Sequence, residues 1–128
     1  MKGDDPWIGR TYHLPSGTRY NSEKSHLFIV LTEPRVEKGD ANKVLLVSVS
    51  SRLKSDKTCL LKSGAHPFIK YQSYVIYERM EICSIDFLEG QSRDENMSAR
   101  LMERICRGVF DSPLSQARFE TFYKASLS

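Results

Sequence analysis

The sequence predicts an α+β fold in which a small antiparallel β-barrel is followed by C-terminal helices. Short apolar and β-branched segments, separated by turns rich in Gly, Pro and Ser, occupy residues 7–87. Apolar residues then recur at helical spacing over residues 93–126. Strands followed by helices are typical of an antiparallel sheet that helices cover on one side. The chain has 128 residues, so we expect a single domain over residues 1–128.

Each expected strand is recognised by its β-forming residues and by the turn that ends it. The first, residues 7–14, stops at Pro15, Ser16 and Gly17. The second, residues 26–32, has no polar side chain from Leu27 to Leu31, which predicts burial on both faces. Further strands are expected at residues 43–51, 58–61 and 73–82, with residues 83–87 extending the last strand or forming a separate one.

The helical segment carries signals for its own ends. Ser92, with Glu95 three positions later, predicts a capping box at the start of the first helix. Gly108 predicts the C-terminal end of that helix. Ser112 followed by Pro113 predicts the start of a second helix, which continues to the end of the chain.

The composition favours a soluble protein of the cytoplasm. Charged residues make up 27% of the chain and hydrophobic ones 40%, and no apolar run approaches the length of a membrane span. Asp4 and Asp5 stand where a signal peptide would be apolar. We therefore expect a cytoplasmic location and no membrane partner.

Charge and cysteine usage restrict the ligands to consider. The net charge of +3 permits an anionic partner such as RNA without requiring one. Cys59, Cys83 and Cys106 form no C-x-x-C pair, so we expect reduced residues in or near the core. The sequence has no Walker loop and no G-x-G-x-x-G motif, and we expect no cofactor.

The residues best suited to chemistry gather in one segment, residues 62–78. Ser63 and Gly64 predict a turn, and Pro67 biases His66 towards an extended conformation. Reactive polar groups beside turns favour a functional loop, because binding groups collect on loops held by a rigid scaffold. The structural alternative is that His66 caps a turn and that the neighbouring tyrosines are half-buried.

The three histidines, His13, His26 and His66, all fall in the strand-rich half of the chain. Two imidazoles brought together could act as base and acid on a phosphodiester that carries a 2′-OH. The alternative for each is an imidazole with a purely structural role. Their spacing offers no local pair of metal ligands, so we expect no metal site. Ser50, near the end of an expected strand, has a hydroxyl that could donate to a phosphate or cap a turn.

Cations and aromatic residues alternate along the expected strands. This pattern is compatible with phosphate contacts and base stacking on single-stranded RNA, and equally with a solvated sheet face. The cations are Arg19, Arg35, Lys57, Lys70 and Arg79, interleaved with Tyr20, Tyr71, Tyr74 and Tyr77.

Residues 9–13, 26–31 and 43–51 together resemble the MazF/PemK-like toxins of bacterial toxin–antitoxin pairs. Residues 59–70, with Ser73, Tyr74 and Val75, resemble a divergent PemK-like subgroup more narrowly. The resemblance covers about residues 8–85. It implies an SH3-like barrel that cleaves single-stranded RNA without a metal ion and is inhibited by an antitoxin protein. The basic pI, near 8.8, makes an acidic antitoxin the expected partner, and homodimer formation is left open.

The resemblance also implies site residues. The family usually has arginine at the position of His26, threonine or serine at that of Ser50, and in some members an acidic residue near Glu78. His26 either replaces arginine as the catalytic group, with His66 as its partner, or belongs to a barrel that binds without cutting. The candidate catalytic residues are His66, His26, Ser50 and Glu78, and the candidate RNA-binding residues are Arg19, Lys70, Ser73, Tyr74 and Arg79.

The first functional hypothesis is therefore an endoribonuclease toxin of a type II toxin–antitoxin pair. The RNA 2′-OH would attack the adjacent phosphate, His66 or His26 would move the proton, and Ser50 with Lys70 or Arg79 would hold the phosphate. This mechanism predicts that His26, His66 and Ser50 share one concave site. The second hypothesis is a non-catalytic SH3-like barrel that binds RNA or a protein partner.

Overall fold

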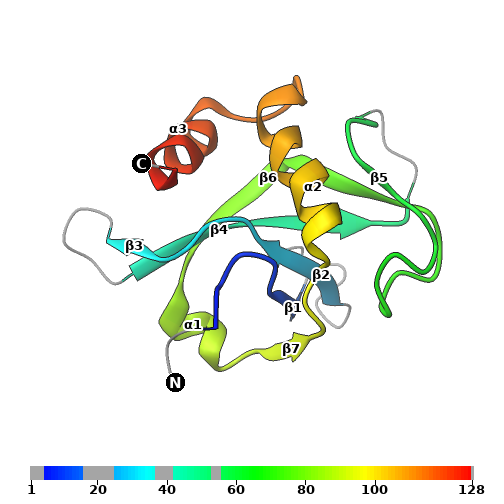
Figure 1. Cartoon of the computed structure of the whole chain (residues 1–128), viewed down its shortest axis with the longest axis horizontal. Coiled ribbons are helices and arrows are strands. Elements are labelled where there is room, and N and C mark those ends of the chain that lie inside the picture. Colours follow the sequence, from blue (N-terminus) through cyan, green and yellow to red (C-terminus); the bar gives the residue numbers. More distant parts are fainter. Residues whose placement is uncertain (1–4, 16–24, 37–41, 53–55, 128) are drawn as a thin grey trace.

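The computed structural model describes residues 5–15, 25–36, 42–52 and 56–127. Within these residues the chain combines a curled antiparallel sheet, shaped as half of a barrel, with three helices (Figure 1). The strands are β1 (Thr11–Pro15), β2 (Ser25–Val30), β3 (Arg35–Val36), β4 (Asn42–Ser50), β5 (Leu60–Leu61), β6 (Ser73–Ser84) and β7 (Ser92–Asp94). The helices are α1 (Ile85–Glu89), α2 (Ala99–Asp111) and α3 (Ala117–Ser126).

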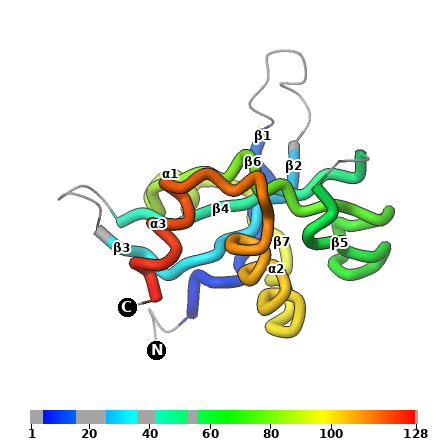
Figure 2. The backbone as a smooth tube through the Cα atoms, turned by 90° about the horizontal axis from the view of Figure 1, so that it is seen from above, coloured from blue at the N-terminus to red at the C-terminus, as the bar shows by residue number. Residues whose placement is uncertain are grey.

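The strands pair in the order β5-β6-β4-β2-β1-β7, with β3 attached to β4, and all of these pairings are antiparallel. Helix α2 packs on β6, and α3 packs on β4, β6 and α2. The loop after β5 lies at one end of the molecule, and β3 and α3 lie at the other (Figure 2). The prediction of an antiparallel sheet combined with C-terminal helices is confirmed.

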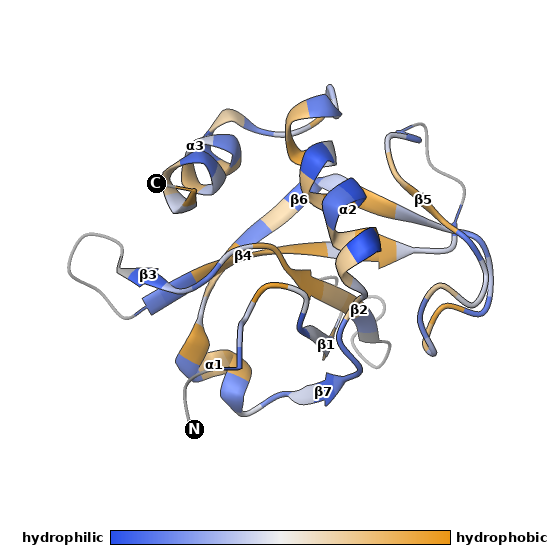
Figure 3. Ribbon diagram, viewed as in Figure 1, coloured by the Kyte–Doolittle hydropathy of each residue, from blue (hydrophilic) through white to orange (hydrophobic). Residues whose placement is uncertain are grey.

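The two faces of β2 enter two different hydrophobic cores, as its uninterrupted apolar run predicted. Leu27 and Ile29 are fully buried in a core shared with α2 and α3, which we call the helix-side core. Phe28 and Val30 lie on the opposite face, in a core that includes Leu88 of α1 and that we call the α1-side core. Figure 3 shows hydrophobic residues concentrated along β2 and β4 between these two cores.

Two boundaries in the second half of the chain differ from the prediction. Residues 85–87, expected as strand, belong to α1, because the Ser84 hydroxyl accepts a hydrogen bond from the Phe87 N–H and caps a helix. Ser92 does not cap a helix. It begins β7, which pairs with β1, and α2 starts only after its own cap, Ser98. The capping box predicted at Ser92 is therefore wrong, because this segment pairs with β1 as a strand of the sheet.

The predicted ends of the two long helices are also wrong. Gly108 lies inside α2, which continues to Asp111, and Ser112 is its C-cap, whereas α3 begins at Ala117. The Ser112 hydroxyl donates to Oδ2 of Asp56 at 2.6 Å, and Oδ1 of Asp56 accepts the N–H of Thr58. Ser112 thus joins the end of α2 to the segment before β5, a long-range partner that local sequence cannot indicate.

Gly108 allows α2 to approach β6 closely. Tyr77 of β6 is fully buried, and its hydroxyl donates to the Ile105 carbonyl oxygen at 2.6 Å. Burial raises the pKa of the Tyr77 phenol, which therefore stays protonated as a donor. A Cβ built on Gly108 would lie 2.0 Å from the Tyr77 hydroxyl oxygen, so only glycine fits at this point of the helix.

Replacing Gly108 with alanine should destabilise the protein, although alanine is the better helix former by ~1 kcal/mol. The added methyl group forces the fully buried Tyr77 ring to move, and such overpacking costs about 1–3 kcal/mol. Urea denaturation should show a lower midpoint for Gly108→Ala. Gly90→Ala is the matched control, because the nearest atom to a Cβ there is 3.7 Å away. Equal midpoints for the two variants would contradict the close contact.

Strand β6 changes face in its middle. Only Val47 of β4 lies between the paired residues Leu46 and Ser48, whereas residues 77–80 of β6 lie between their partners Glu81 and Ile76. Four residues thus face one, and the three extra residues form a bulge. Because three is odd, odd-numbered residues point to the helix-side core before the bulge, whereas even-numbered ones do so after it.

Candidate functional site

A row of polar residues crosses β2, β4 and β6 on the sheet face that also carries the α1-side core. Ser50 of β4 pairs with Tyr74 of β6. The β2–β4 ladder pairs Phe28 with Ser48, and the same register carried two residues further puts His26 opposite Ser50. Residues opposite each other on adjacent strands project from the same face, with Cβ atoms about 5 Å apart. The register therefore supports the predicted proximity of His26 and Ser50.

Both His26 and Ser50 lie where the β2–β4 ladder has stopped, and both are half-buried. The Ser50 hydroxyl oxygen accepts a hydrogen bond from the Arg52 N–H at 3.2 Å. This contact leaves the hydroxyl proton free to donate to an incoming oxygen. Tyr74 is only 6% exposed, so neighbouring atoms cover almost all of its ring and leave little surface on which a base could stack. We call His26, Ser50 and Tyr74 the strand-end row.

The structure does not place His66 in this row. His66 is 2% exposed, and backbone groups contact both of its ring nitrogens. Nδ1 lies 3.0 Å from the Phe68 N–H and accepts its hydrogen bond, so the proton is on Nε2, which donates to the Glu95 carbonyl oxygen at 2.6 Å. The expectation of an accessible loop imidazole is wrong, because this side chain closes its own loop and ties it to the segment after β7.

His26 and His66 lie on opposite faces of the β1–β2 hairpin. His26 shares its strand face with Phe28, because alternate residues of a strand point the same way. His66 lies near His13 and Asp94, on the face that Leu27 shares. No hydrogen bond or ion pair joins His26 to His66 among the residues that the structure describes. The predicted site containing both imidazoles is therefore not formed.

An Asp–His pair that the sequence did not reveal lies beside His66. Nε2 of His13 in β1 donates to Oδ2 of Asp94 in β7 at 2.6 Å, and Oδ1 of Asp94 lies 4.0 Å from Nε2 of His66. The Glu95 N–H, which donates to Asp94, contributes most to lowering the pKa of that carboxyl, and His13 lowers it further. The β1–β7 pairing brings residues 13 and 94 together. The sequence could have indicated this contact only through a predicted strand at residues 92–94.

The remaining predicted RNA-binding residues of this region fall on the loop after β5 and its junction with β6. Lys70 is exposed on that loop. Ser73 is buried, and its hydroxyl donates to the Tyr71 carbonyl oxygen at 2.9 Å, so it fixes the chain where the loop enters β6. Ser73 therefore shapes the backbone beside Tyr74 and does not offer a free hydroxyl.

Glu78 and Arg79 are exposed in the bulge of β6. They follow Tyr74 by four and five residues, which is roughly 13–16 Å along a strand. The Glu78 carbonyl oxygen accepts a hydrogen bond from the Gln116 side chain, which places this part of β6 near the start of α3. The structure thus separates Glu78 and Arg79 from the strand-end row. Arg19 lies outside the described residues.

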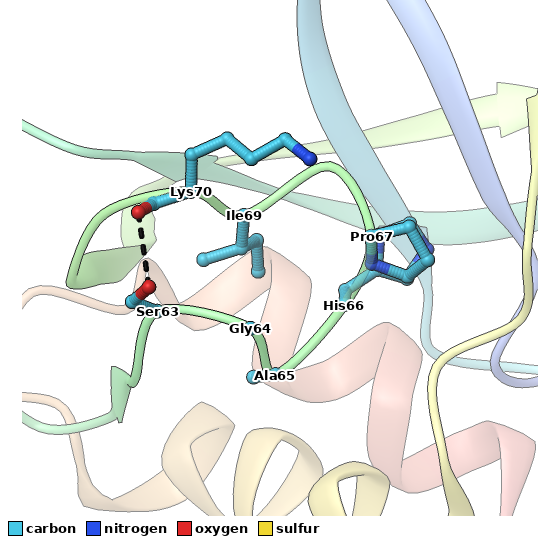
Figure 4. Close-up of a pocket in the computed structure, with 7 residues that line it drawn as sticks. All are labelled: Ser63, Gly64, Ala65, His66, Pro67, Ile69 and Lys70. Carbon is cyan, nitrogen blue, oxygen red and sulfur yellow. Dashed lines mark hydrogen bonds between the residues drawn. The ribbon is translucent and has the colours of Figure 1, made fainter.

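The loop after β5 forms a pocket of about 300 Å³, at the lower end of the volumes of small-molecule sites. Gly64 adopts φ +87°, and its N–H donates to the Ile69 carbonyl oxygen at 2.8 Å. The Ser63 hydroxyl donates to the Lys70 carbonyl oxygen at 3.0 Å, which closes the loop on itself (Figure 4). The Lys70 side chain extends along the loop above Ile69, so a cation stands at the rim of the pocket (Figure 4).

The three cysteines, Cys59, Cys83 and Cys106, are free thiols. Burial raises the pKa of each thiol, so little reactive thiolate forms near neutral pH. Within the described part of the chain, no group of three His, Cys, Asp or Glu side chains is arranged to hold a metal ion. None of the described helices has the length and apolar character needed to cross a membrane.

Comparisons with known proteins gave no match to a protein-family model, to a curated protein sequence or to a solved structure.

Proposed function

We propose that the protein is an endoribonuclease toxin of a type II toxin–antitoxin pair, a divergent PemK-like member of the MazF/PemK-like toxins with an SH3-like barrel. The observation that supports the proposal is the β2–β4 register, which pairs Phe28 with Ser48 and, extended two residues beyond the ladder, brings His26 opposite Ser50. The resemblance implies the catalytic residues of this family at these two positions. The curled antiparallel half-barrel is compatible with the fold that the resemblance implies.

The mechanism is metal-independent cleavage of single-stranded RNA through the 2′-OH. The His26 imidazole accepts the 2′-OH proton while the 2′ oxygen forms a bond to the adjacent phosphorus and the bond to the 5′ oxygen breaks. The departing 5′ oxygen takes a proton from His26 or from water. The Ser50 hydroxyl donates to a non-bridging phosphate oxygen and stabilises the charge that develops there. The products carry a 2′,3′-cyclic phosphate and a 5′-OH.

The partner that fits this proposal is an acidic antitoxin protein that inhibits the toxin in the cytoplasm. A chain of net charge +3 that binds RNA attracts an acidic segment to the same surface. Such a segment, if disordered when free, folds on binding and covers the site.

The test is incubation of the purified protein with end-labelled single-stranded RNA in the presence of EDTA. We expect fragments with 2′,3′-cyclic phosphate ends, and we expect Ser50→Ala to lower the cleavage rate by about 10²–10³. Ser92→Ala is the matched control, because Ser92 is exposed on β7. Absence of fragments, or equal rates for Ser50→Ala and Ser92→Ala, would contradict the proposal.

A second candidate is a non-catalytic barrel that binds RNA or a protein partner. The observation that favours it is the occupation of both ring nitrogens of His66 by backbone groups, which leaves His26 without a second imidazole. RNA that is bound but stays intact under the same conditions would identify this function.

A further inference from the structure

We infer that the loop of residues 62–72 is a platform on which bases of single-stranded RNA stack, with its lysines on the phosphates. The inference rests on the proposed function, because it assigns to this loop part of the RNA that the proposed endoribonuclease binds. Its residues are Lys62, Ser63, Gly64, Ala65, His66, Pro67, Phe68, Ile69, Lys70, Tyr71 and Gln72.

Two aromatic side chains of this loop are exposed although the loop is well anchored. Tyr71 is 74% exposed and Phe68 is 41% exposed. A large aromatic side chain is normally buried, and an isolated exposed one needs no explanation. Two of them within four residues on one closed loop offer flat apolar surfaces on which bases of any sequence can stack.

The charge of the loop selects a polyanion. Lys62 and Lys70 are exposed, and residues 62–72 contain no Asp or Glu. Aromatic rings with cations match the alternating bases and phosphates of a single strand. The carboxylate beside the loop, that of Asp94, is already held by His13 and by the Glu95 N–H. An acidic protein segment would meet the same cations, but it would supply no series of rings to stack on Phe68 and Tyr71. The observations therefore favour RNA over a protein partner.

Buried contacts hold the loop in one conformation. Ile69 inserts into the helix-side core, and His66 ties the loop to Glu95 through its Nε2–H. The Phe68 ring meets the His13 ring edge-on, with 4.6 Å between the ring centroids, and Asp94 fixes His13. The Asp–His pair thus orients an exposed aromatic side chain. A platform that is already ordered loses little conformational entropy when a strand binds, which raises affinity.

The C-terminal end of the platform adjoins the strand-end row in sequence. Tyr71 precedes Tyr74 by three residues, and the buried Ser73 fixes the backbone between them. Tyr74 in turn pairs with Ser50. Tyr71 therefore lies at the end of the platform nearer to the row that we propose as the catalytic site, whereas Phe68 contacts His13, on the other face of the β1–β2 hairpin from His26. In this arrangement the loop positions the strand and takes no part in the bond-breaking step.

The test measures binding of a short, fluorescein-labelled single-stranded 2′-O-methyl RNA by fluorescence anisotropy. This probe lacks the 2′-OH nucleophile, so binding is read whether or not the protein cleaves RNA. We expect Tyr71→Ala and Phe68→Ala to weaken binding by about 5- to 100-fold each. We expect Lys70→Gln to weaken binding and to reduce the salt slope of log K by about 0.7.

Two controls match these variants in residue type and exposure elsewhere on the surface. Phe87→Ala removes an exposed ring of α1, and Lys124→Gln removes an exposed cation of α3. The inference is overturned if Tyr71→Ala and Phe68→Ala bind the probe as tightly as the parent, or if the controls lose as much affinity. It is also overturned if the parent binds an acidic peptide but not the probe. Intact RNA in the cleavage assay, combined with the expected losses here, would refute cleavage and leave the platform standing.

Discussion

His26→Ala is expected to lower the rate of RNA cleavage by about 10²–10⁴, the usual range for loss of a general acid or base. His26 is half-buried at the start of β2, and the β2–β4 register, extended two residues beyond the ladder, brings it opposite Ser50. No other imidazole lies on this face of the β1–β2 hairpin in the described residues. The measurement is the single-turnover rate on labelled RNA in EDTA, with binding of the 2′-O-methyl probe as the control for folding and affinity.

His26→Arg is the informative companion variant. It restores the residue that the resemblance implies at this position, so partial recovery of cleavage relative to His26→Ala is expected. If His26→Ala cleaves at the parental rate, the strand-end row is not the catalytic site. In that case the Asp–His pair of His13 and Asp94 becomes the group to test, because it holds the other imidazole that is partly exposed.

His66→Ala is expected to act on stability. The substitution leaves the Phe68 N–H and the Glu95 carbonyl oxygen without their partners and opens a cavity where a side chain 2% exposed had been. Unsatisfied polar groups cost ~1–3 kcal/mol each, so with two such groups and a cavity we expect the free energy of unfolding to fall by ~2 kcal/mol or more. This is a large part of the ~5–15 kcal/mol of a typical domain.

Urea denaturation of His66→Ala, with Gln72→Ala as the control in the same loop, provides the measurement. Gln72 is exposed, so its variant should unfold at the parental midpoint. A loss below about 1 kcal/mol for His66→Ala would contradict the structural role. If His66→Ala were as stable as the parent but cleaved RNA far more slowly, a direct part in proton transfer would have to be restored to His66.

The sequence predicted well what depends on local pattern. The apolar run of β2 predicted its burial on both faces, and β-branched and aromatic residues predicted β4 and β6. It failed where a distant partner overrides a local signal. The sequence around Ser92 resembles a helix N-cap, but this segment pairs with β1 as a strand. The sequence around Ser112 resembles another N-cap, but the Ser112 hydroxyl donates to Asp56 instead.

The candidate site shows the same division. The proximity of Ser50 and His26 was predicted from the resemblance and from their positions at the ends of expected strands, both of which can be found in a sequence. The burial of His66 depends on Glu95, 29 residues away, and the pairing of His13 with Asp94 spans 81 residues. Neither contact produces a periodic pattern in the sequence. From the sequence alone, a histidine beside Pro67 is therefore predicted to be an accessible loop residue.

Because of the bulge, the number of residues in β6 decides which side chains face each core, whereas the residue types within the bulge matter less. The first half of β6 contributes Tyr74 to the strand-end row. Residues 81–84 pair with the first half of β4, where Val44 and Leu46 belong to the α1-side core. Deleting a single residue between Tyr77 and Met80 would leave two extra residues in the bulge, which is an even number. The side chains of one half of β6 would then point to the opposite face of the sheet from the one they occupy now. Depending on which half shifts, the side chain of Tyr74 or that of Cys83 would leave its present face of the sheet, and the residue next to it in sequence would take its place. Related sequences should therefore vary in residue type at this bulge, where Glu78 and Arg79 are exposed, but should keep the number of residues that separates the two halves.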